Sequence, residues 1–569
     1  MRIHAIRRGL IAGLFSLIIV FAAQAASPGR WDEFVGSFLD EYFVLNPDSA
    51  VYLGRHEHDG KLPDWSEAGL QKKIAWLETS RITALAFKAD ELDAAARFER
   101  DYLIARIRSD LFWLKTADLP HTSPYFYADS LDPDVYVSRP YAPLATRLQA
   151  YLKYARAVPG ALAQIKENLK GPQKQALLNI SQRSIGGLAD FYADDVPKVF
   201  ADELTGPLKT EFAETNATAI KAVQEFVVWL GEREKTASPD FALGPDKFRA
   251  MLRETEGVDV SLDELEAIGW KDLERNRQAI QAACAEYAPG VPVREAIARA
   301  MAHKPEGGVV PFARLQLKRL EQFVRDKNIV SIPGTEEALV KESPAYRSWN
   351  SAYISIAGPY EKGLPSVYYV SPPDPTWSPE KQLGYIPSVS NLQSTSVHEV
   401  WPGHFLQFLH ANRSSSRIGR VFVGYSYAEG WAHYVEEMMF EVGLDEGKPE
   451  MRIGQLMKAL MRNARFLSAI GLHTKGMTVA ESEKLFSDQA YSDEGTAEQQ
   501  AKRGTFDPAY LNYTLGKLMI LKLRADWTAT RGGQAAWREF HDTFLQYGGP
   551  PIPLVRRAMM GEADRGPLF

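Results

Sequence analysis

One stretch of the chain crowds two imidazoles and a carboxylate into seven residues: Ser396-Val-His398-Glu399-Val-Trp-Pro402-Gly403-His404-Phe-Leu-Gln407. The whole sequence of 569 residues has only 11 histidines, so composition alone does not explain this pairing. On a regular helix, side chains six positions apart point roughly 120° away from each other. Pro402 lacks an amide and disfavours helical torsions in the residue before it, and Gly403 tolerates torsions that other residues avoid. The stretch therefore predicts a bulged or broken helix that turns His404 back toward His398.

The two histidines are candidate metal ligands, and a catalytic zinc ion usually takes a third protein ligand while leaving one place for water. Glu429 is the best candidate, 25 residues after His404 in the segment Tyr425-Ser-Tyr427-Ala-Glu429-Gly-Trp431-Ala-His433. The segment between them is long enough to return along an antiparallel helix. We expect the two nitrogens and a carboxylate oxygen to converge within about 3–4 Å of one another around a single Zn2+ per chain. The alternative is that these are ordinary polar residues beside a helix kink.

Three neighbouring residues have candidate roles. Glu399 follows the first histidine and is the candidate general base, as in zinc sites of the H-E-x-x-H type. Glu436 lies on the same helical face as Glu429, seven residues further on, and is suited to orient a ligand histidine. His433, four residues after Glu429, is a further ligand, a polar group of a cleft, or a packed side chain.

The hydrophobic periodicity is helical nearly throughout, which predicts an all-α, mainly helical protein. Pro159-Gly160 and Gly171-Pro172 predict breaks between helices of the first half. Ser261-Leu-Asp-Glu264 and Thr478-Val-Ala-Glu481 have the pattern of capping boxes, which open helices. The helices expected around the metal site are 391–412, 425–443, 449–472 and 508–528.

The pattern changes near residue 350. The segments 352–357 and 366–371 are rich in β-branched and aromatic residues and predict a short β-hairpin beside the active site. A Pro- and Gly-containing stretch near residue 240 marks a weak boundary. We expect an N-terminal helical lobe over 26–240 and a helical lobe carrying the metal site over 241–569, the two forming one continuous structural unit.

Residues 1–25 have the pattern of a cleavable signal peptide, with a basic start, a short apolar run and the small-x-small site Ala23-Gln-Ala25. The alternative is an N-terminal anchor helix. Cleavage after Ala25 lowers Lys+Arg from 66 to 63 against 72 Asp+Glu, so the net charge moves from −6 to −9. We therefore expect a periplasmic or secreted protein that binds neither nucleic acid nor, after cleavage, a membrane.

Two features outside the motif have modest interpretations. Cys284 is the only cysteine, so no internal disulfide can form, and we expect a small buried side chain. His56-Glu57-His58 lies in a turn-rich loop, where the histidines are either solvated or structural.

The double motif H-E-x-x-P-G-H-x-L-Q and E-G-W-A-x-Y-x-E resembles the bacterial domain-of-unknown-function 885 family, which is similar to helical gluzincin metallopeptidases. Pro47-Asp-Ser-Ala50, 364–372, Arg503 with Pro508, and 513–517 also resemble segments of that family. The resemblance implies that His398, His404 and Glu429 are zinc ligands and that Glu399 is the base. It also implies a large helical, zincin-like peptidase body with a deep cleft between two lobes. The family often has a second histidine where this chain has Phe405.

Peptide hydrolysis needs further groups around the metal. An oxyanion donor is required besides zinc; Tyr513 is the first candidate and Tyr510 the second, and the alternative is that both are core aromatics. The hairpin, which carries Tyr369, could pair with an extended substrate backbone. The candidates for holding a substrate carboxylate, each of which could instead form a structural ion pair, are Arg503, Lys517 and Arg524.

The sequence thus predicts an exported zinc metallopeptidase that hydrolyses oligopeptides. Two alternatives remain: a zinc hydrolase of a non-peptide amide or ester, and a peptide-binding protein that kept the fold and lost catalysis. The sequence makes no prediction of oligomeric state, of side-chain preference, or of cleavage at an end against cleavage within the peptide.

Overall fold

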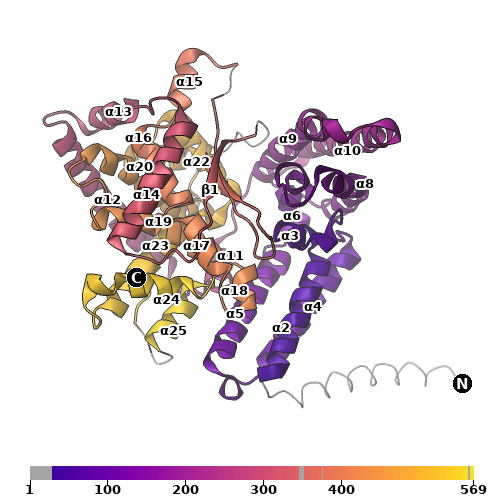
Figure 1. Ribbon diagram of the computed structural model, residues 1–569, viewed down its shortest axis with the longest axis horizontal. Helices are drawn as coiled ribbons and strands as arrows, with labels where there is room; N and C mark the ends of the chain where they lie inside the picture. Colours follow the sequence, from indigo (N-terminus) through magenta and orange to yellow (C-terminus); the bar gives the residue numbers. More distant parts are fainter. Residues whose placement is uncertain (1–27, 345–351, 374–375, 562–563, 565) are drawn as a thin grey trace, which may run out of the picture.

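The computed structural model describes residues 28–344, 352–373, 376–561, 564 and 566–569; the predicted signal peptide lies outside this range. The protein is mainly helical, as the periodicity predicted, with one small sheet (Figure 1). Within the described residues, no helix combines the length and the apolar character of a membrane span.

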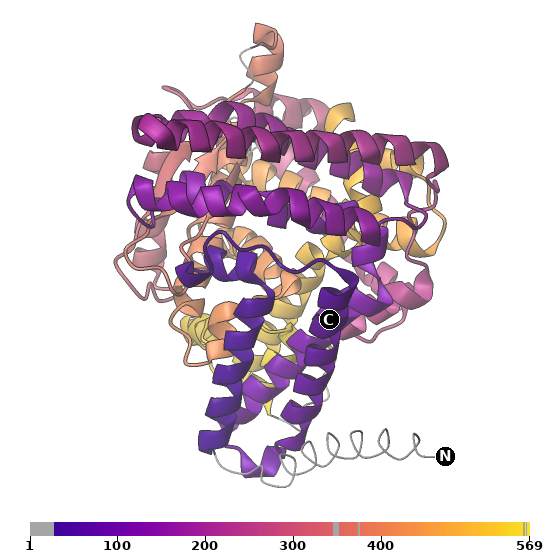
Figure 2. The same ribbon diagram turned by 90° about the vertical axis from the view of Figure 1, so that its right-hand side faces the viewer.

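The first part of the chain lies on one side of the molecule (Figures 1 and 2). The long helices α8, α9 and α10 pack on one another around a shared apolar core. The helices of this part are α2 (Pro28–Leu45), α3 (Pro47–Tyr52), α4 (Glu67–Ala86), α5 (Ala94–Leu111), α6 (Leu119–Thr122), α7 (Asp134–Ser138), α8 (Leu144–Asn168), α9 (Gln175–Phe200) and α10 (Gly206–Arg233).

One of the two breaks predicted here is absent. Pro159 lies inside α8, which continues to Asn168, whereas Gly171-Pro172 does separate α8 from α9. Val158 and Leu162 are buried on either side of the proline. The packing of both halves of the helix therefore outweighs the hydrogen bond that the proline removes.

The second part of the chain surrounds the candidate metal residues. The helix pairs that pack on each other most extensively are α12 with α20 and α19 with α23. The helices of this part are α11 (Pro245–Met251), α12 (Leu262–Tyr287), α13 (Val293–Ala302), α14 (Val309–Lys327), α15 (Pro379–Tyr385), α16 (Val389–Glu399), α17 (His404–Ala411), α18 (Arg417–Val421), α19 (Tyr425–Glu441), α20 (Pro449–Thr474), α21 (Val479–Gln489), α22 (Glu494–Phe506), α23 (Asn512–Thr528), α24 (Trp537–Leu545) and α25 (Ile552–Met560).

Both predicted caps open helices, but only one is a complete capping box. Thr478 accepts a hydrogen bond from the amide of Glu481, whose carboxylate accepts one from the amide of Thr478. At the start of α12, Ser261 accepts from the amide of Glu264. In both cases a side chain satisfies an amide that the first helical turn leaves without a partner.

The predicted hairpin forms within a larger sheet. β2 (Ala352–Ser355) pairs antiparallel with β3 (Ser366–Val370), and β1 (Ala338–Glu342), which the sequence analysis did not identify, pairs parallel on the other side of β3. β3 is therefore the central strand and every one of its residues is buried. Only β1 and β2 have a free edge, so an extended substrate could not pair with the strand that carries Tyr369.

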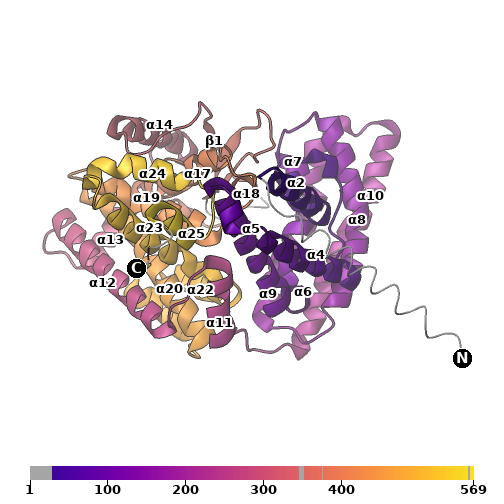
Figure 3. The ribbon, with the colours of Figure 1, turned by 90° about the horizontal axis from the view of Figure 1, so that it is seen from below.

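The N-terminal helices α2, α4 and α5 share an apolar core with residues from the metal-bearing part of the chain. Ile418 and Phe422 belong to this core, and Tyr102 on α5 donates a hydrogen bond to the carbonyl of Phe422. Figure 3 shows α5 running between the two sides of the molecule. The lobe boundary near residue 240 and the deep cleft stay predictions.

The loop that contains His56 is ordered by a distant segment. Its imidazole lies 3.1 Å from Asp59 and 3.2 Å from Glu361, and it stacks on the ring of Tyr141 at 3.7 Å. His56 therefore ties the N-terminal part of the chain to the β2–β3 connection, and the structural interpretation of this histidine holds.

Candidate metal centre

The histidine stretch forms two helices with a tight turn between them. α16 ends at Glu399 and α17 begins at His404, so the predicted break in the helix is confirmed. The Trp401–Pro402 peptide bond is cis. A side chain on Gly403 would overlap the carbonyl oxygen of His398, so the close approach of the turn to the end of α16 requires glycine.

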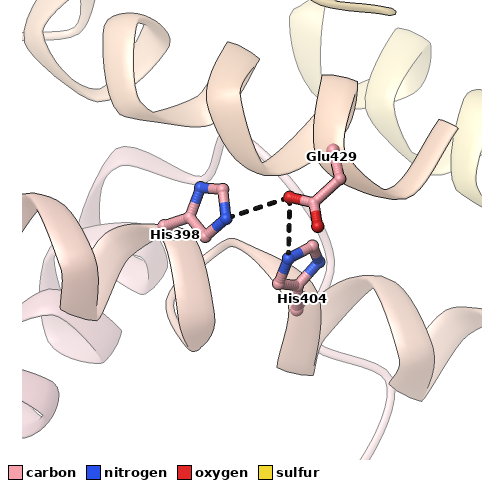
Figure 4. Close-up of side chains that lie close together, drawn as sticks. All are labelled: His398, His404 and Glu429. Atoms are coloured by element: carbon pink, nitrogen blue, oxygen red, sulfur yellow. Dashed lines mark ion pairs between the residues drawn. The ribbon is translucent and has the colours of Figure 1, made fainter. Parts of the chain in front are cut away.

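The turn brings His404 beside His398, and Glu429 reaches both from α19 (Figure 4). Glu429 Oε2 lies 3.2 Å from Nε2 of His398 and 3.4 Å from Nε2 of His404. The three candidate ligand atoms all lie within 4.8 Å of one another. Their side chains are 8, 12 and 20% exposed, so the group is covered but still open to solvent on one side.

Two contacts fix α19 against the ligand-bearing turn and against α23. The indole of Trp431 donates a hydrogen bond of 2.9 Å to the carbonyl of Pro402. Gly430 packs directly on the backbone at Gly516, and a side chain on either residue would overlap the opposite helix. This close crossing brings the start of α23 next to Glu429.

Glu436 lies behind His398, as predicted from its helical spacing. Its carboxylate accepts a hydrogen bond of 2.7 Å from Nδ1 of His398. Although burial raises the pKa of Glu436, the Arg462 guanidinium and the His398 hydrogen bond hold it well below its usual range. An ionised carboxylate only accepts hydrogen bonds, so Nδ1 of His398 carries a proton, and Nε2 is the nitrogen that faces Glu429.

The arrangement fits a divalent metal ion. Nε2 of His398 faces Glu429 Oε2, and an imidazole whose single proton is on Nδ1 presents a lone pair there, so a cation between the two atoms satisfies both. Glu429 Oε2 is buried and makes no hydrogen bond of acceptable geometry. Two imidazoles and one carboxylate, with a carboxylate behind the first histidine, form a donor set typical of catalytic zinc.

Glu399 and Phe405 flank the ligands. Glu399 is the last residue of α16 and is half-buried; burial raises the pKa of its carboxyl group, while the neighbouring imidazoles oppose the rise. Phe405 is buried edge-on against Trp401, with ring centres 5.1 Å apart. His404 is therefore the histidine of this turn that faces Glu429, and the phenylalanine takes a packing position.

The two candidate oxyanion donors differ in their surroundings. Tyr513, in the first turn of α23, lies with its ring nearly parallel to that of His398 at 6.3 Å. Tyr510 is fully buried and its hydroxyl donates to Ser468. The structure thus contradicts a contact between Tyr510 and substrate, because this hydroxyl is held in the core.

Two of the three predicted carboxylate-binding cations belong to the core. Lys517 is fully buried, 2.8 Å from Glu437 and 3.5 Å from Asp272, so it cannot reach a substrate. Arg524 pairs with Glu441 at 2.6 Å and stacks on Trp537. Both are structural ion pairs, which was the alternative interpretation; the predicted substrate-binding role of Lys517 is wrong.

Arg503 lies near the metal residues. Its guanidinium is 5.8 Å from the centre of the Tyr513 ring and is held by Asp507 at 2.9 Å and by the Tyr425 hydroxyl at 3.0 Å. Its side chain is 30% exposed, so it can still meet a ligand.

His433 and Tyr369 contact neighbours that favour packing roles. His433 is fully buried, 3.3 Å from Arg462, and burial lowers the pKa of its imidazole to about 3. It is outside the group of three candidate ligands found among the described residues. Tyr369 stacks on Tyr353 of the neighbouring strand at 5.1 Å, and a contact with substrate stays a prediction.

A set of basic residues on α20 was not predicted from the sequence. Lys458, Arg462 and Arg465 are spaced by four and three positions, which places them on one helical face. Arg462 bonds to Glu436 and lies 3.1 Å from Nδ1 of His398. The spacing was visible in the sequence, but basic residues at helical intervals usually form a solvated face, so only the packing of α20 reveals this role.

Comparison with known proteins covers almost the whole chain. A solved structure of a proposed lipoprotein of unknown function from Shewanella oneidensis is 25% identical, with a TM-score of 0.78 over 94% of this chain and 100% of that one. A proposed lipoprotein from Colwellia psychrerythraea is 17% identical, with a TM-score of 0.80 over 94% and 99% of the two chains, and this likeness concerns the fold alone. No curated protein is significantly similar to the chain.

The resemblance noted from the double motif extends well beyond it. Residues 47–559 match a single family model, whose range includes the helical N-terminal part, the sheet, the three candidate ligands and Tyr513. The chain therefore belongs to the family of bacterial proteins of unknown function designated DUF885.

Proposed function

We propose that this protein is an exported zinc metallopeptidase that hydrolyses oligopeptides. The observation that carries the proposal is the convergence of His398, His404 and Glu429, with Glu436 holding His398 from behind. Two imidazoles and a carboxylate leave one position of a tetrahedral zinc ion for water or substrate, as catalytic sites require. The signal-like segment 1–25 and the likeness to proposed lipoproteins support a periplasmic or secreted location.

His398, His404 and Glu429 would hold the metal, and zinc, when bound, supplies a Lewis acid that polarises a carbonyl and acidifies water. Glu399 accepts the proton of the attacking water and delivers it to the nitrogen of the leaving amine. This role is supported by its position directly after His398 and by the two imidazoles, which lie near enough to lower the pKa of its carboxyl group. Hydrolysis then breaks the amide bond and leaves a carboxylate and an amine.

Tyr513 is the side chain best placed to donate a hydrogen bond to the developing oxyanion. Its ring lies beside His398, and Arg462, Arg465 and Arg503 each have their guanidinium carbon within 5.8 Å of the ring centre. A phenol held beside positive charge is a strong donor. The function of Glu436 and Arg462 in this scheme is to fix the orientation and tautomer of His398.

The experiment begins with metal analysis of protein purified with zinc and incubation of that protein with a mixed peptide library. We expect one zinc per chain and cleavage that falls by about 100- to 10,000-fold in Glu399→Gln, because the general base is lost while the ligands remain. Tyr513→Phe should lower kcat by about 100- to 1,000-fold at unchanged zinc content. Glu498→Gln changes an exposed carboxylate of α22 and serves as the matched control.

The same experiment separates the alternatives. Zinc-loaded protein that binds peptides without cutting them would identify a binding protein. Zinc-loaded protein that ignores peptides and turns over esters or other amides would identify a non-peptide hydrolase. Either result would overturn the peptidase proposal.

A further inference from the structure

Arg465 on α20 and Arg503 on α22 lie beside the metal residues, and Lys458 lies on the same helical face as Arg465, seven residues before it. We call them the basic cluster. The guanidinium carbons of Arg465 and Arg503 lie 4.9 and 5.8 Å from the centre of the Tyr513 ring. That ring lies 6.3 Å from the imidazole of His398, so the cluster is one aromatic ring away from a candidate ligand.

Two members of the cluster have no carboxylate of their own. Among the ion pairs of the described residues, Arg503 has Asp507, but none includes Arg465 or Lys458. Arg465 is only 6% exposed and its Nε donates to a neutral partner, Gln500, at 2.7 Å. Buried charges in proteins are normally paired, because desolvation of an isolated charge is costly.

The electrostatics of the cluster agree with its geometry. Burial and the positive charge of Arg462 together lower the pKa of the Lys458 ammonium to about 8, although Glu436 and Glu399 oppose the shift. Burial and the positive charge of Arg503 also lower the pKa of Arg465. Arg465 is disfavoured by Arg503, and Lys458 by Arg465, so an anion beside Arg465 would be stabilised by its cationic neighbours.

The basic cluster lies at a distance from the metal residues that suits the C-terminal carboxylate of a bound peptide. In a peptide whose last bond is being cut, only a nitrogen and a Cα separate the scissile carbonyl carbon from the terminal carboxylate carbon. The two carbons therefore lie about 3.5–4 Å apart. A peptide that runs from the metal residues toward Tyr513 would bring its C-terminal carboxylate within reach of the long arginine side chains beside that ring.

We propose that the basic cluster of Lys458, Arg465 and Arg503 binds the C-terminal α-carboxylate of the substrate, which makes the protein a carboxypeptidase. This inference rests on the proposed peptidase function and specifies its substrate. Arg465 is the principal residue, because it is buried, lacks a carboxylate partner and can offer a bidentate pair of donors. The product is one free amino acid released per cut.

The activity test compares an N-acetylated tripeptide that has a free C-terminus with the same tripeptide amidated there. We expect the zinc-loaded enzyme to release the last residue of the free acid and to cut the amide at least about 100-fold less efficiently in kcat/KM. Arg465→Gln should reduce this preference to less than about tenfold, and Arg465→Lys should retain part of it. Arg524→Gln removes another buried arginine, remote from this cluster and paired with Glu441, and should leave the preference unchanged.

A binding test removes the dependence on turnover. Calorimetry with Glu399→Gln protein should show the free acid binding at least about 30-fold more tightly than the amide, and the added Arg465→Gln change should abolish the difference. A further pair of amidated tripeptides, ending in glutamate or glutamine, distinguishes a terminal carboxylate from a side-chain carboxylate. Preference for the amidated glutamate peptide over the free acid would assign the cluster to acidic side chains and overturn the proposal.

The two proposals fail in different ways. Zinc-dependent cleavage that is internal, or equal for the free acid and the amide, would overturn the carboxypeptidase inference and leave the peptidase function standing. Preferential binding of the free acid by a protein that cuts no peptide would support the carboxylate site and overturn the peptidase function. Equal binding of the free acid and the amide would overturn the carboxylate site.

Discussion

Two groups of charges in the metal-bearing part of the chain differ in how the charges are matched. In the first, which we call the core ion cluster, Lys517 lies between Glu437 and Asp272, and Arg275 completes the set from α12. In the basic cluster beside the metal residues, Lys458 and Arg465 form no ion pair with a carboxylate of the described residues. The matched charges join helices, whereas the unmatched ones are suited to a ligand.

The difference lies in desolvation. A buried ion pair recovers by attraction much of what its removal from water costs, and its loss leaves an uncompensated charge. Unmatched buried cations reduce stability in the absence of a ligand, and such groups are more common at functional sites than in structural cores. The comparison therefore predicts that substitutions in the core ion cluster affect folding and that substitutions beside the metal affect ligands.

The largest effect should come from Lys517→Met. The change leaves Glu437 and Asp272 with less positive charge in a buried position, so we expect a loss of about 3–5 kcal/mol in the free energy of unfolding. Denaturant titration measures this loss. Lys522→Met on the same helix removes a half-exposed pair with Asp526 and should cost less than about 1 kcal/mol. Equal losses in the two variants would contradict the distinction drawn here.

Glu436→Gln should have the next largest effect, on metal affinity. Loss of the negative charge behind His398 weakens the orientation and basicity of that imidazole, so zinc affinity should fall by about 10- to 100-fold. Competition with a zinc chelator measures it. Glu441→Gln removes another carboxylate of α19, paired with Arg524 away from the ligands, and should leave zinc affinity unchanged. An unchanged affinity in the Glu436 variant would remove this residue from the metal site.

Arg465→Gln should have a small effect on stability. The substitution loses one hydrogen bond to Gln500 but also relieves repulsion from Arg503, so the free energy of unfolding should change by less than about 1 kcal/mol. The same denaturant titration applies. A loss as large as that of Lys517→Met would place Arg465 with the structural ions and not with the ligand-binding ones.

The smallest effect on stability should come from replacing His56, which is partly exposed. Burial disfavours the protonated imidazole of His56. Hydrogen bonds to Asp59 and Glu361 outweigh this effect and raise the pKa of His56 to about 9. An unfolded histidine has a pKa of about 6.5, so the protonated pairs stabilise the protein fully below that pH. This contribution is lost as pH rises through about 9. We expect the difference in Tm between wild type and His56→Gln to be largest near pH 6 and to disappear by about pH 10; a pH-independent difference would contradict this pairing.

The sequence by itself determined the features that depend on spacing along one element. Helical periodicity predicted the all-α fold, and Pro402-Gly403 predicted the break that turns His404 toward His398. Glu436 could be assigned to a position behind a ligand because seven residues bring it back to the face of Glu429. These conclusions needed no knowledge of remote segments.

Only the tertiary structure decided which charges and hydroxyls meet. Lys517 and Arg503 looked alike in the sequence, yet one is sealed between α12 and α19 and the other lies beside Tyr513. Tyr510 and Tyr513 are three residues apart, but the hydroxyl of Tyr510 donates to Ser468 in the core, whereas the ring of Tyr513 lies beside His398. The physical reason is common to these cases: spacing determines the face of the helix on which a residue lies, while its partners come from segments remote in the sequence.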